Sequence, residues 1–160
     1  MVGPGVQSRG VDDATWSDHT DIRPTMLLLA GLKDDYGHDG RALVEDLSID
    51  ALPPALVGSG RDVAFRLLAA AYKQINAPVG ALGMASLAAS TTALAGDDAT
   101  YAAIESEIGG WTTQRDALAS TIGQLIENAE FNGQPVNVDE ALSLALQAAA
   151  LVARVEAASH

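Results

Sequence analysis

The residues best suited to chemistry lie between positions 12 and 41. Carboxylates bind hard divalent cations, and a histidine among them would favour zinc or manganese. Adjacent Asp18 and His19 form the tightest such pair, and His38 would be a third ligand if the chain were a small metal-binding protein. The acidic and imidazole side chains of this stretch are Asp12, Asp13, Asp18, His19, Asp21, Asp34, Asp35, His38 and Asp39.

Most of these side chains have a simpler interpretation as turn and cap residues. Asp-Asp and Asp-Gly pairs are typical of turns, and Asp21 stands where it can cap a helix. No ligand spacing in the stretch matches a self-sufficient metal motif. We therefore expect no metal site in this chain, and the candidate ligands that remain are Asp18 and His19.

Sequence motifs for nucleophilic catalysis and nucleotide binding are missing. The pattern Gly-x-Ser-x-Gly does not occur, and the run from Gly58 to Gly60 reads as a linker. The chain has no cysteine, which excludes disulfides, thiolate metal sites and cysteine nucleophiles. The sequence therefore predicts no catalytic residue, no cofactor-binding residue and no cofactor for this chain alone.

The elements that must position these residues are helical. Of the 160 residues, 48% are hydrophobic but only 4% are aromatic, which favours helices rich in Ala and Leu over a β-sandwich. Residues 1–57 are rich in turn signals, whereas residues 58–160 are rich in Ala and have longer apolar periodicity. We predict a mainly α fold, in which a short irregular and helical N-terminal segment precedes a multi-helix bundle. The predicted domains are 1–57 and 58–160.

The sequence places a helix from Ile22 to Gly31, with Pro24 in its first turn and Thr20 or Asp21 as its cap. A second helix is expected at 61–76, with a buried face made of Ala64, Leu67, Leu68, Ala71 and Ile75. A less regular helix is expected at 83–95.

The most regular pattern is a heptad-like seam between 101 and 129. Its members recur at alternating spacings of three and four: Tyr101, Ile104, Ile108, Trp111, Arg115, Leu118, Ile122, Leu125 and Ala129. A capping-box-like run at Asn137 to Glu140 opens a last helix, from Val138 to about Ala157. Because the connection between these two helices is short, we predict an antiparallel helical hairpin.

The formal charge of −12 argues against nucleic acid and against electrostatic docking on anionic lipid. The longest strongly apolar run, from Met26 to Leu32, is far shorter than the roughly 20 residues of a membrane span. The sequence as given has no signal peptide, so it predicts a cytoplasmic protein, or an exported one if the gene begins upstream of Met1.

Three runs of the N-terminal segment form a pattern: Val2-Gly-Pro-Gly-Val6, Trp16-Ser-Asp-His-Thr-Asp-Ile-Arg-Pro-Thr-Met-Leu-Leu-Leu-Ala-Gly-Leu32 and His38-Asp-Gly-Arg-Ala-Leu43. Their order and spacing resemble the C-terminal end of the catalytic domain in the alkaline phosphatase superfamily, which includes sulfatases and nucleotide pyrophosphatase/phosphodiesterases. In that family a final strand ends in a Gly-Pro-like turn, an Asp-Ile/Leu-x-Pro-Thr segment opens a helix, and an Asp-Gly-Arg-x-Leu turn follows.

The resemblance implies that residues 1–57 are the remnant of an alkaline-phosphatase-like α/β domain and that residues 58–160 are a helical tail domain. Enzymes of the family use a Ser or Thr nucleophile and two divalent metal ions, of the zinc or manganese type, held by Asp and His. Those elements lie upstream of the matched portion, and the turn after Gly3 holds no histidine. The resemblance thus implies a C-terminal fragment of a metal-dependent phosphohydrolase-like protein that is not catalytically competent alone.

Two kinds of partner follow from these interpretations. A fragment would associate with the upstream catalytic portion of such an enzyme. The alternative is an independent acidic helical interaction or structural module, which would bind a helical partner through a seam such as 101–129. In the fragment interpretation the helix at 22–31 lacks the sheet it normally covers, so we expect residues 1–57 to be loosely packed.

Overall fold

The computed structural model describes residues 2–159, and Met1 and His160 lie outside the described residues. Across residues 2–159 the chain forms helices and no β-strand, with one isolated antiparallel bridge between Val6 and Leu47. The predicted mainly α fold with a helical bundle is confirmed. The α-helices are α1 (Ile22–Ala30), α2 (Arg61–Asn76), α3 (Ala81–Ala93), α4 (Asp98–Phe131) and α5 (Val138–Ala158), and the short 3-10 turns are His19–Asp21, Val44–Asp46, Ile49–Ala51 and Pro54–Leu56.

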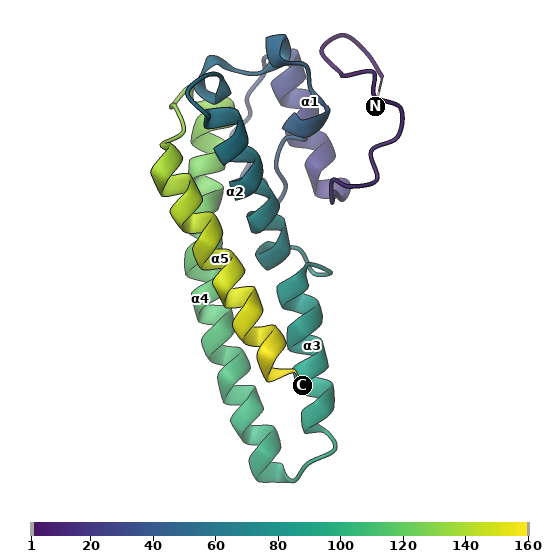
Figure 1. The fold of residues 1–160 in the computed structure, drawn as a ribbon, viewed down its shortest axis with the longest axis vertical. Coiled ribbons are helices and arrows are strands. Elements are labelled where there is room, and N and C mark those ends of the chain that lie inside the picture. The colour runs from purple at the N-terminus through teal and green to yellow at the C-terminus, as the bar shows by residue number, and fades with distance from the viewer. Residues whose placement is uncertain (1, 160) are drawn as a thin grey trace.

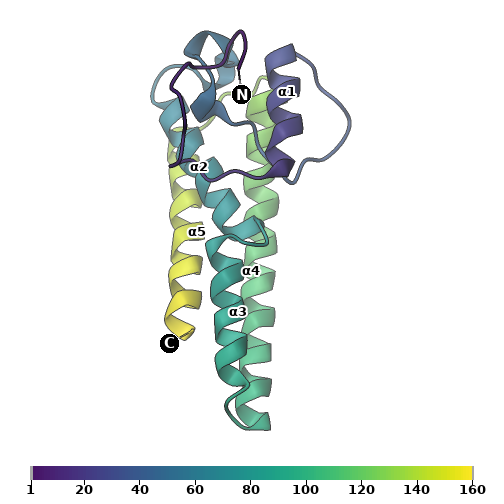
Figure 2. The same ribbon diagram turned by 90° about the vertical axis from the view of Figure 1, so that its right-hand side faces the viewer.

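Helices α2 to α5 build an elongated bundle of three columns (Figure 1). Helices α2 and α3 follow each other along one column, α4 runs back along the whole length, and α5 returns beside it, so the predicted antiparallel hairpin of α4 and α5 is present. Figure 2 shows that the outer ends of α3 and α4 extend past the C-terminal end of α5. Helix α1 lies beside the opposite end of the bundle, next to the N-terminal segment.

Helix α1 begins with Pro24 in its first turn and ends at Gly31, whose φ of 63° is the left-handed conformation that glycine adopts without strain. Asp21, one of the two predicted caps, stands at the N-cap position of α1, but its side chain makes no capping hydrogen bond to the helix. Instead Asp18 caps the turn His19–Asp21: its carboxylate accepts from the Thr20 amide, and its own amide donates to Asp21. The carboxylate of Asp21 is engaged by groups distant in sequence.

Helix α2 has the predicted bounds but a different buried face. Leu67 is 51% exposed, whereas Phe65 and Tyr72 are buried together with Ala64 and Leu68. The two large aromatic side chains bury more apolar area than Leu67, so the helix is rotated toward them.

The seam of α4 is buried toward its C-terminal end, where Ile122 and Ala129 belong to the core. Tyr101 is exposed because no part of α5 reaches this end of α4. Arg115, at the middle of the seam, is half-buried and pairs with Asp116 at 2.6 Å.

The core is continuous between the N-terminal segment and the bundle. Ala42, Val44, Leu47 and Leu56 are almost completely buried in the same cluster as the core residues of α2, α4 and α5. The expectation that residues 1–57 are loosely packed is therefore wrong for 41–56, because their short turns cover one end of the bundle. Residues 8–14 are exposed. The domain boundary after residue 57 stays a prediction.

Gly109 lies in the middle of α4, where a glycine lowers helix stability. A Cβ added there would meet nothing within 4 Å. Replacing Gly109 with alanine is expected to raise the free energy of unfolding by about 1 kcal/mol, measured by urea denaturation followed by circular dichroism. Gly40→Ala is expected to lower the free energy of unfolding instead, because the added Cβ would lie 2.2 Å from the carbonyl oxygen of Thr20. A Gly109→Ala variant less stable than the wild type would contradict the prediction.

Candidate functional site

Five polar or charged residues are buried where the N-terminal segment meets the bundle. They come from four separate parts of the chain, and together they form what we call the Asp21 network. Its members are Asp21, Thr25, Arg41, Lys73 and Glu130. Because burying a charge without a partner is costly, the contacts of this network decide whether it serves structure or chemistry.

Asp21 is the centre of the network and is fully buried. Its Oδ1 atom accepts hydrogen bonds from the Arg41 amide at 3.0 Å and from Lys73 Nζ at 3.0 Å. Its Oδ2 atom accepts from the Asp18 amide at 3.0 Å. Both oxygens are thus held by donors, and one charged partner balances the carboxylate.

Lys73 reaches this carboxylate from α2, 52 residues away in sequence. Its Nζ atom also donates to Asp18 Oδ2 at 3.0 Å and to Thr20 Oγ1 at 3.2 Å. The ammonium lies 5.3 Å from the ring centre of Trp16, within the range of a cation–π contact. Burial opposes ionisation of Asp18, but the hydrogen bonds from Thr20 and Lys73 outweigh it and lower the pKa of Asp18. The ammonium of Lys73 thus occupies the place that a metal cation would take beside these carboxylates.

Glu130, near the end of α4, connects the bundle to the Asp-Gly-Arg turn. Its Oε1 atom accepts from the Ala42 amide at 2.7 Å. Burial raises the pKa of Glu130 to about 8, against the opposing effects of that hydrogen bond and of the Arg41 charge. At neutral pH its carboxyl group therefore carries its proton.

Arg41 and Thr25 complete the network. The Arg41 guanidinium pairs with Glu45 and donates to the Ala42 carbonyl oxygen at 3.1 Å, while its Nε atom has no partner within residues 2–159. Thr25 donates to the Asp21 carbonyl at 2.6 Å and accepts from the Leu43 amide at 2.9 Å. These bonds attach α1 to the turn that follows it.

A cleft of about 290 Å³ lies beside the network, between residues 37–40 and α4. Its polar wall includes His38, Asp39, Tyr72 and Glu130. Burial and the charges of Asp39 and Asp21 raise the pKa of Tyr72. The Nε2 atom of His38 lies 3.2 Å from Asp34, and its ring centre lies 5.8 Å from that of Phe131. The cleft supplies polar groups but no paired nucleophile and base.

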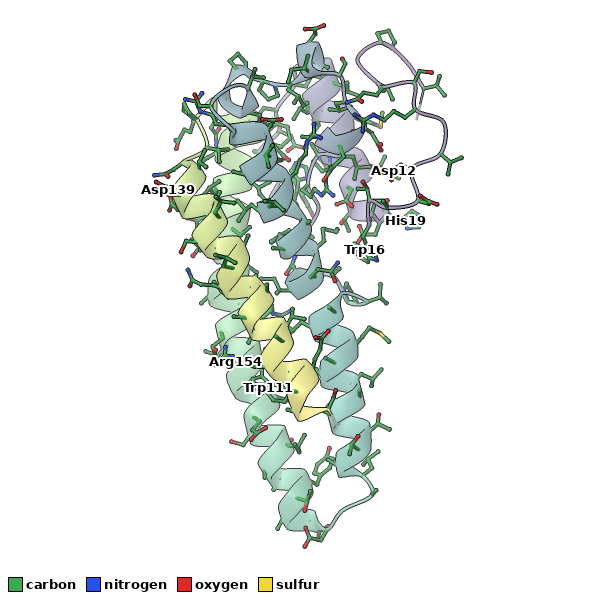
Figure 3. The ribbon with its side chains drawn as sticks, viewed as in Figure 1. Asp12, Trp16, His19, Trp111, Asp139 and Arg154 are labelled. Carbon is green, nitrogen blue, oxygen red and sulfur yellow. The ribbon has the colours of Figure 1, made fainter. Side chains whose placement is uncertain are left out.

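The structure separates the residues considered as metal ligands. Asp18 is bound by Lys73 and Thr20, while His19 is exposed on the outside of the N-terminal segment, near Trp16 (Figure 3). Within residues 2–159 no three His, Asp or Glu side chains are grouped closely enough to hold a metal ion. The residues present therefore do not fit a two-metal centre, and whether Asp18 and His19 bind a metal stays a prediction.

Sequence reasoning missed Lys73 and Glu130. A signal for each exists in the periodicity. Lys73 follows Ala69 by four residues on the buried side of α2, and Glu130 follows Ile126 by four on the buried side of α4. A charged residue at core spacing predicts a buried ionic partner, but neither pattern says which residue that partner is.

No protein-family model matches the sequence, and comparisons with curated proteins and with solved structures found no significant match.

Proposed function

We propose that this chain is the C-terminal portion of an alkaline phosphatase family, metal-dependent phosphohydrolase-like protein, and that it is not catalytically competent alone. This proposal is supported by the contacts of the residues that carry the resemblance to the alkaline phosphatase superfamily. Asp18, Thr20, Asp21 and Arg41 all belong to one buried network or its rim, and Lys73 joins them to the helical tail. Their role here is to attach the tail to the end of a catalytic domain.

The outward face of α1 supports the same proposal. Ile22 and Met26 of α1, and Leu32 just after its C-terminal Gly31, are more than half exposed. A helix that covers a parallel sheet buries such a face. The partner that fits is the upstream catalytic portion, which would also determine where the protein is located.

The residues of this chain supply structure to that enzyme rather than chemistry. The two metal ions of the family would activate the nucleophile and stabilise the charge that develops at phosphorus. The upstream portion would hold them, because the carboxylate of Asp18 and that of Asp21 both bind Lys73 instead. In this proposal the helical tail holds residues 16–42 in place, through Lys73 beneath Asp21 and Glu130 on the Ala42 amide.

The isolated chain is expected to hydrolyse no bis(4-nitrophenyl) phosphate above the background of free zinc or manganese ions, followed as release of nitrophenolate. Residues 2–159 include no group of three or more Asp, Glu or His side chains that could hold a metal ion, and we expect no activated nucleophile among them. Hydrolysis that EDTA abolishes and that a Lys73→Met variant changes would overturn the proposal.

The upstream nucleotide sequence provides a second test. We expect it to encode, in some reading frame, a Ser or Thr nucleophile with Asp and His ligands. If the upstream sequence encodes nothing of this kind, the assignment to a split or longer enzyme fails.

The alternative function, an independent acidic helical interaction module, is favoured by a different observation. The outward face of α5 is apolar and exposed, with Leu146 at its middle. A module that acts alone would use this face without any upstream portion, so an upstream nucleotide sequence that encodes no catalytic portion would favour this alternative.

A further inference from the structure

Helix α5 is apolar on the side that faces away from the bundle as well as on the side that packs. Its inner stripe, at spacings of three and four, is Ala141, Leu144, Ala148, Leu151 and Val155, and all of these are buried. The opposite side carries apolar Leu142, Leu146, Ala149, Ala150 and Ala153 with two uncharged polar residues, Ser143 and Gln147, among them, and all of these are exposed. Residues 141–153 include no charged side chain at all.

Such a face is unusual on a surface helix. Surface helices normally place charged or polar residues opposite their buried stripe, and a helix that is apolar all round is normally covered on every side. Leu146 is 72% exposed in the single chain. This face, which we call the outer α5 face, therefore requires an occupant.

The charges at its two ends identify that occupant. Asp139 is in the first turn of α5, and Arg154, one of whose guanidinium nitrogens donates to Gln114 Oε1 of α4 at 2.6 Å, is near its C-terminal end (Figure 3). Leu146 lies midway between these two charges, seven residues after Asp139 and eight residues before Arg154. If a second copy of α5 packs antiparallel with Leu146 against Leu146, Asp139 of each copy lies beside Arg154 of the other.

We propose that the outer α5 face is the interface of a symmetric homodimer, in which two α5 helices pack antiparallel about an axis at Leu146. Each copy places Leu142 against the partner's Ala150, so that a large side chain meets a small one on both sides of the axis. A two-fold axis generates both contacts and both ion pairs from one surface. Antiparallel packing also aligns the helix dipoles favourably.

A lipid surface fits the same face less well. By length and composition α5 is the one helix within residues 2–159 that is apolar enough to cross a membrane, a test that core helices of soluble proteins also pass. Its inner stripe, however, packs on α2, α3 and α4. Its ends carry Asp139, Glu140 and Glu156, with no aromatic residue in the helix to anchor it at a membrane interface.

The interface is tested first by the mass of the full chain in solution, measured by light scattering over a range of concentrations. We expect a concentration-dependent dimer. Leu146→Glu places two like charges at the axis and is expected to weaken dimerisation by more than about tenfold. The matched control is Leu94→Glu, since Leu94 is 71% exposed but lies after α3, far from this face. Circular dichroism confirms that each variant keeps its helix content.

The ion pairs give a sharper test of orientation. Asp139→Arg and Arg154→Asp should each weaken the dimer, and the double exchange should restore it. Because the chain lacks cysteine, single cysteines can also report on direction. Asp139→Cys and Ala153→Cys should cross-link to each other in a mixture but neither to itself. Self-cross-linking of each would indicate a parallel dimer and overturn the proposal.

Two further outcomes would overturn it. One is a monomer at every concentration tested. The other is a wild-type chain that remains monomeric but sediments with phosphatidylcholine vesicles, and that loses this binding in Leu146→Glu, which would assign the outer α5 face to a lipid surface. The proposed function does not depend on either result, because it rests on α1 and the Asp21 network.

Discussion

Replacing Lys73 with methionine is expected to lower the free energy of unfolding by about 3–5 kcal/mol, the usual cost of leaving a buried charge without its partner. Methionine preserves the apolar stem of the side chain but removes the ammonium. Asp21, which is fully buried, then keeps its backbone donors but loses its only charged one. Urea denaturation followed by circular dichroism measures the loss.

The other lysine of the chain is a matched control. Lys33 is exposed, so Lys33→Met is expected to change stability by less than about 0.5 kcal/mol. Adding Asp21→Asn to Lys73→Met removes the unpaired charge and should recover most of the lost stability. A double variant as unstable as Lys73→Met would show that lysine acts through packing alone. The double variant is neutral at both positions. If Lys73→Met does not fold, the stability of the double variant can still be compared with that of the wild type, and recovery of a folded protein supports the prediction.

Replacing Glu130 with glutamine is expected to remove a large part of the pH dependence of stability. The pKa of Glu130 is raised from an ordinary value of 4.5 to about 8 in the folded protein. Between these values the unfolded chain releases the proton while the folded chain keeps it, so stability falls as pH rises through this window. Below pH 4.5 both states are protonated, and the contribution is fully present.

The expected size follows from the shift. Each pH unit in the window costs about 1.4 kcal/mol, so between pH 5 and pH 7.5 the wild type should lose about 3 kcal/mol relative to Glu130→Gln. Glutamine retains an oxygen to accept from the Ala42 amide, so the contact itself survives. Urea denaturation across this range measures the difference. Glu127→Gln, an exposed change in the same helix, should follow the wild type; parallel curves for Glu130→Gln and the wild type would contradict the assigned pKa.

The helices could be predicted from the sequence where local signals define them. Pro24 and Gly31 delimit α1, Asn137 caps α5, and the spacing of apolar residues gave the bounds of α2. Local spacing does not determine how each helix is rotated about its own axis, and therefore which of its faces is buried in the bundle. Leu67 and Phe65 are equally good core residues by periodicity, and only contact with α4 and α5 decides between them.

The Asp21 network is harder to predict for a similar reason. Its bonds between separate parts of the chain join residues 18 to 88 positions apart, and each donor or acceptor alone resembles an ordinary turn or surface residue. Asp21 looks like a cap, and it is in fact the centre of a buried charge pair. Asp18 and His19, adjacent in sequence, belong to different environments once the helical tail supplies Lys73.

The distance in sequence between these partners also constrains how the protein is made. Residues 18–42 are made well before α4, and the carboxyl group that binds the Ala42 amide is encoded 88 residues after it. At the usual speed of translation, about 5–20 residues per second, the first part of the chain waits roughly 4–18 s before Glu130 is added. Throughout that interval Ala42 and Val44 lack the complete bundle that buries them in the folded protein, so this end of the core closes only after α4 has been made.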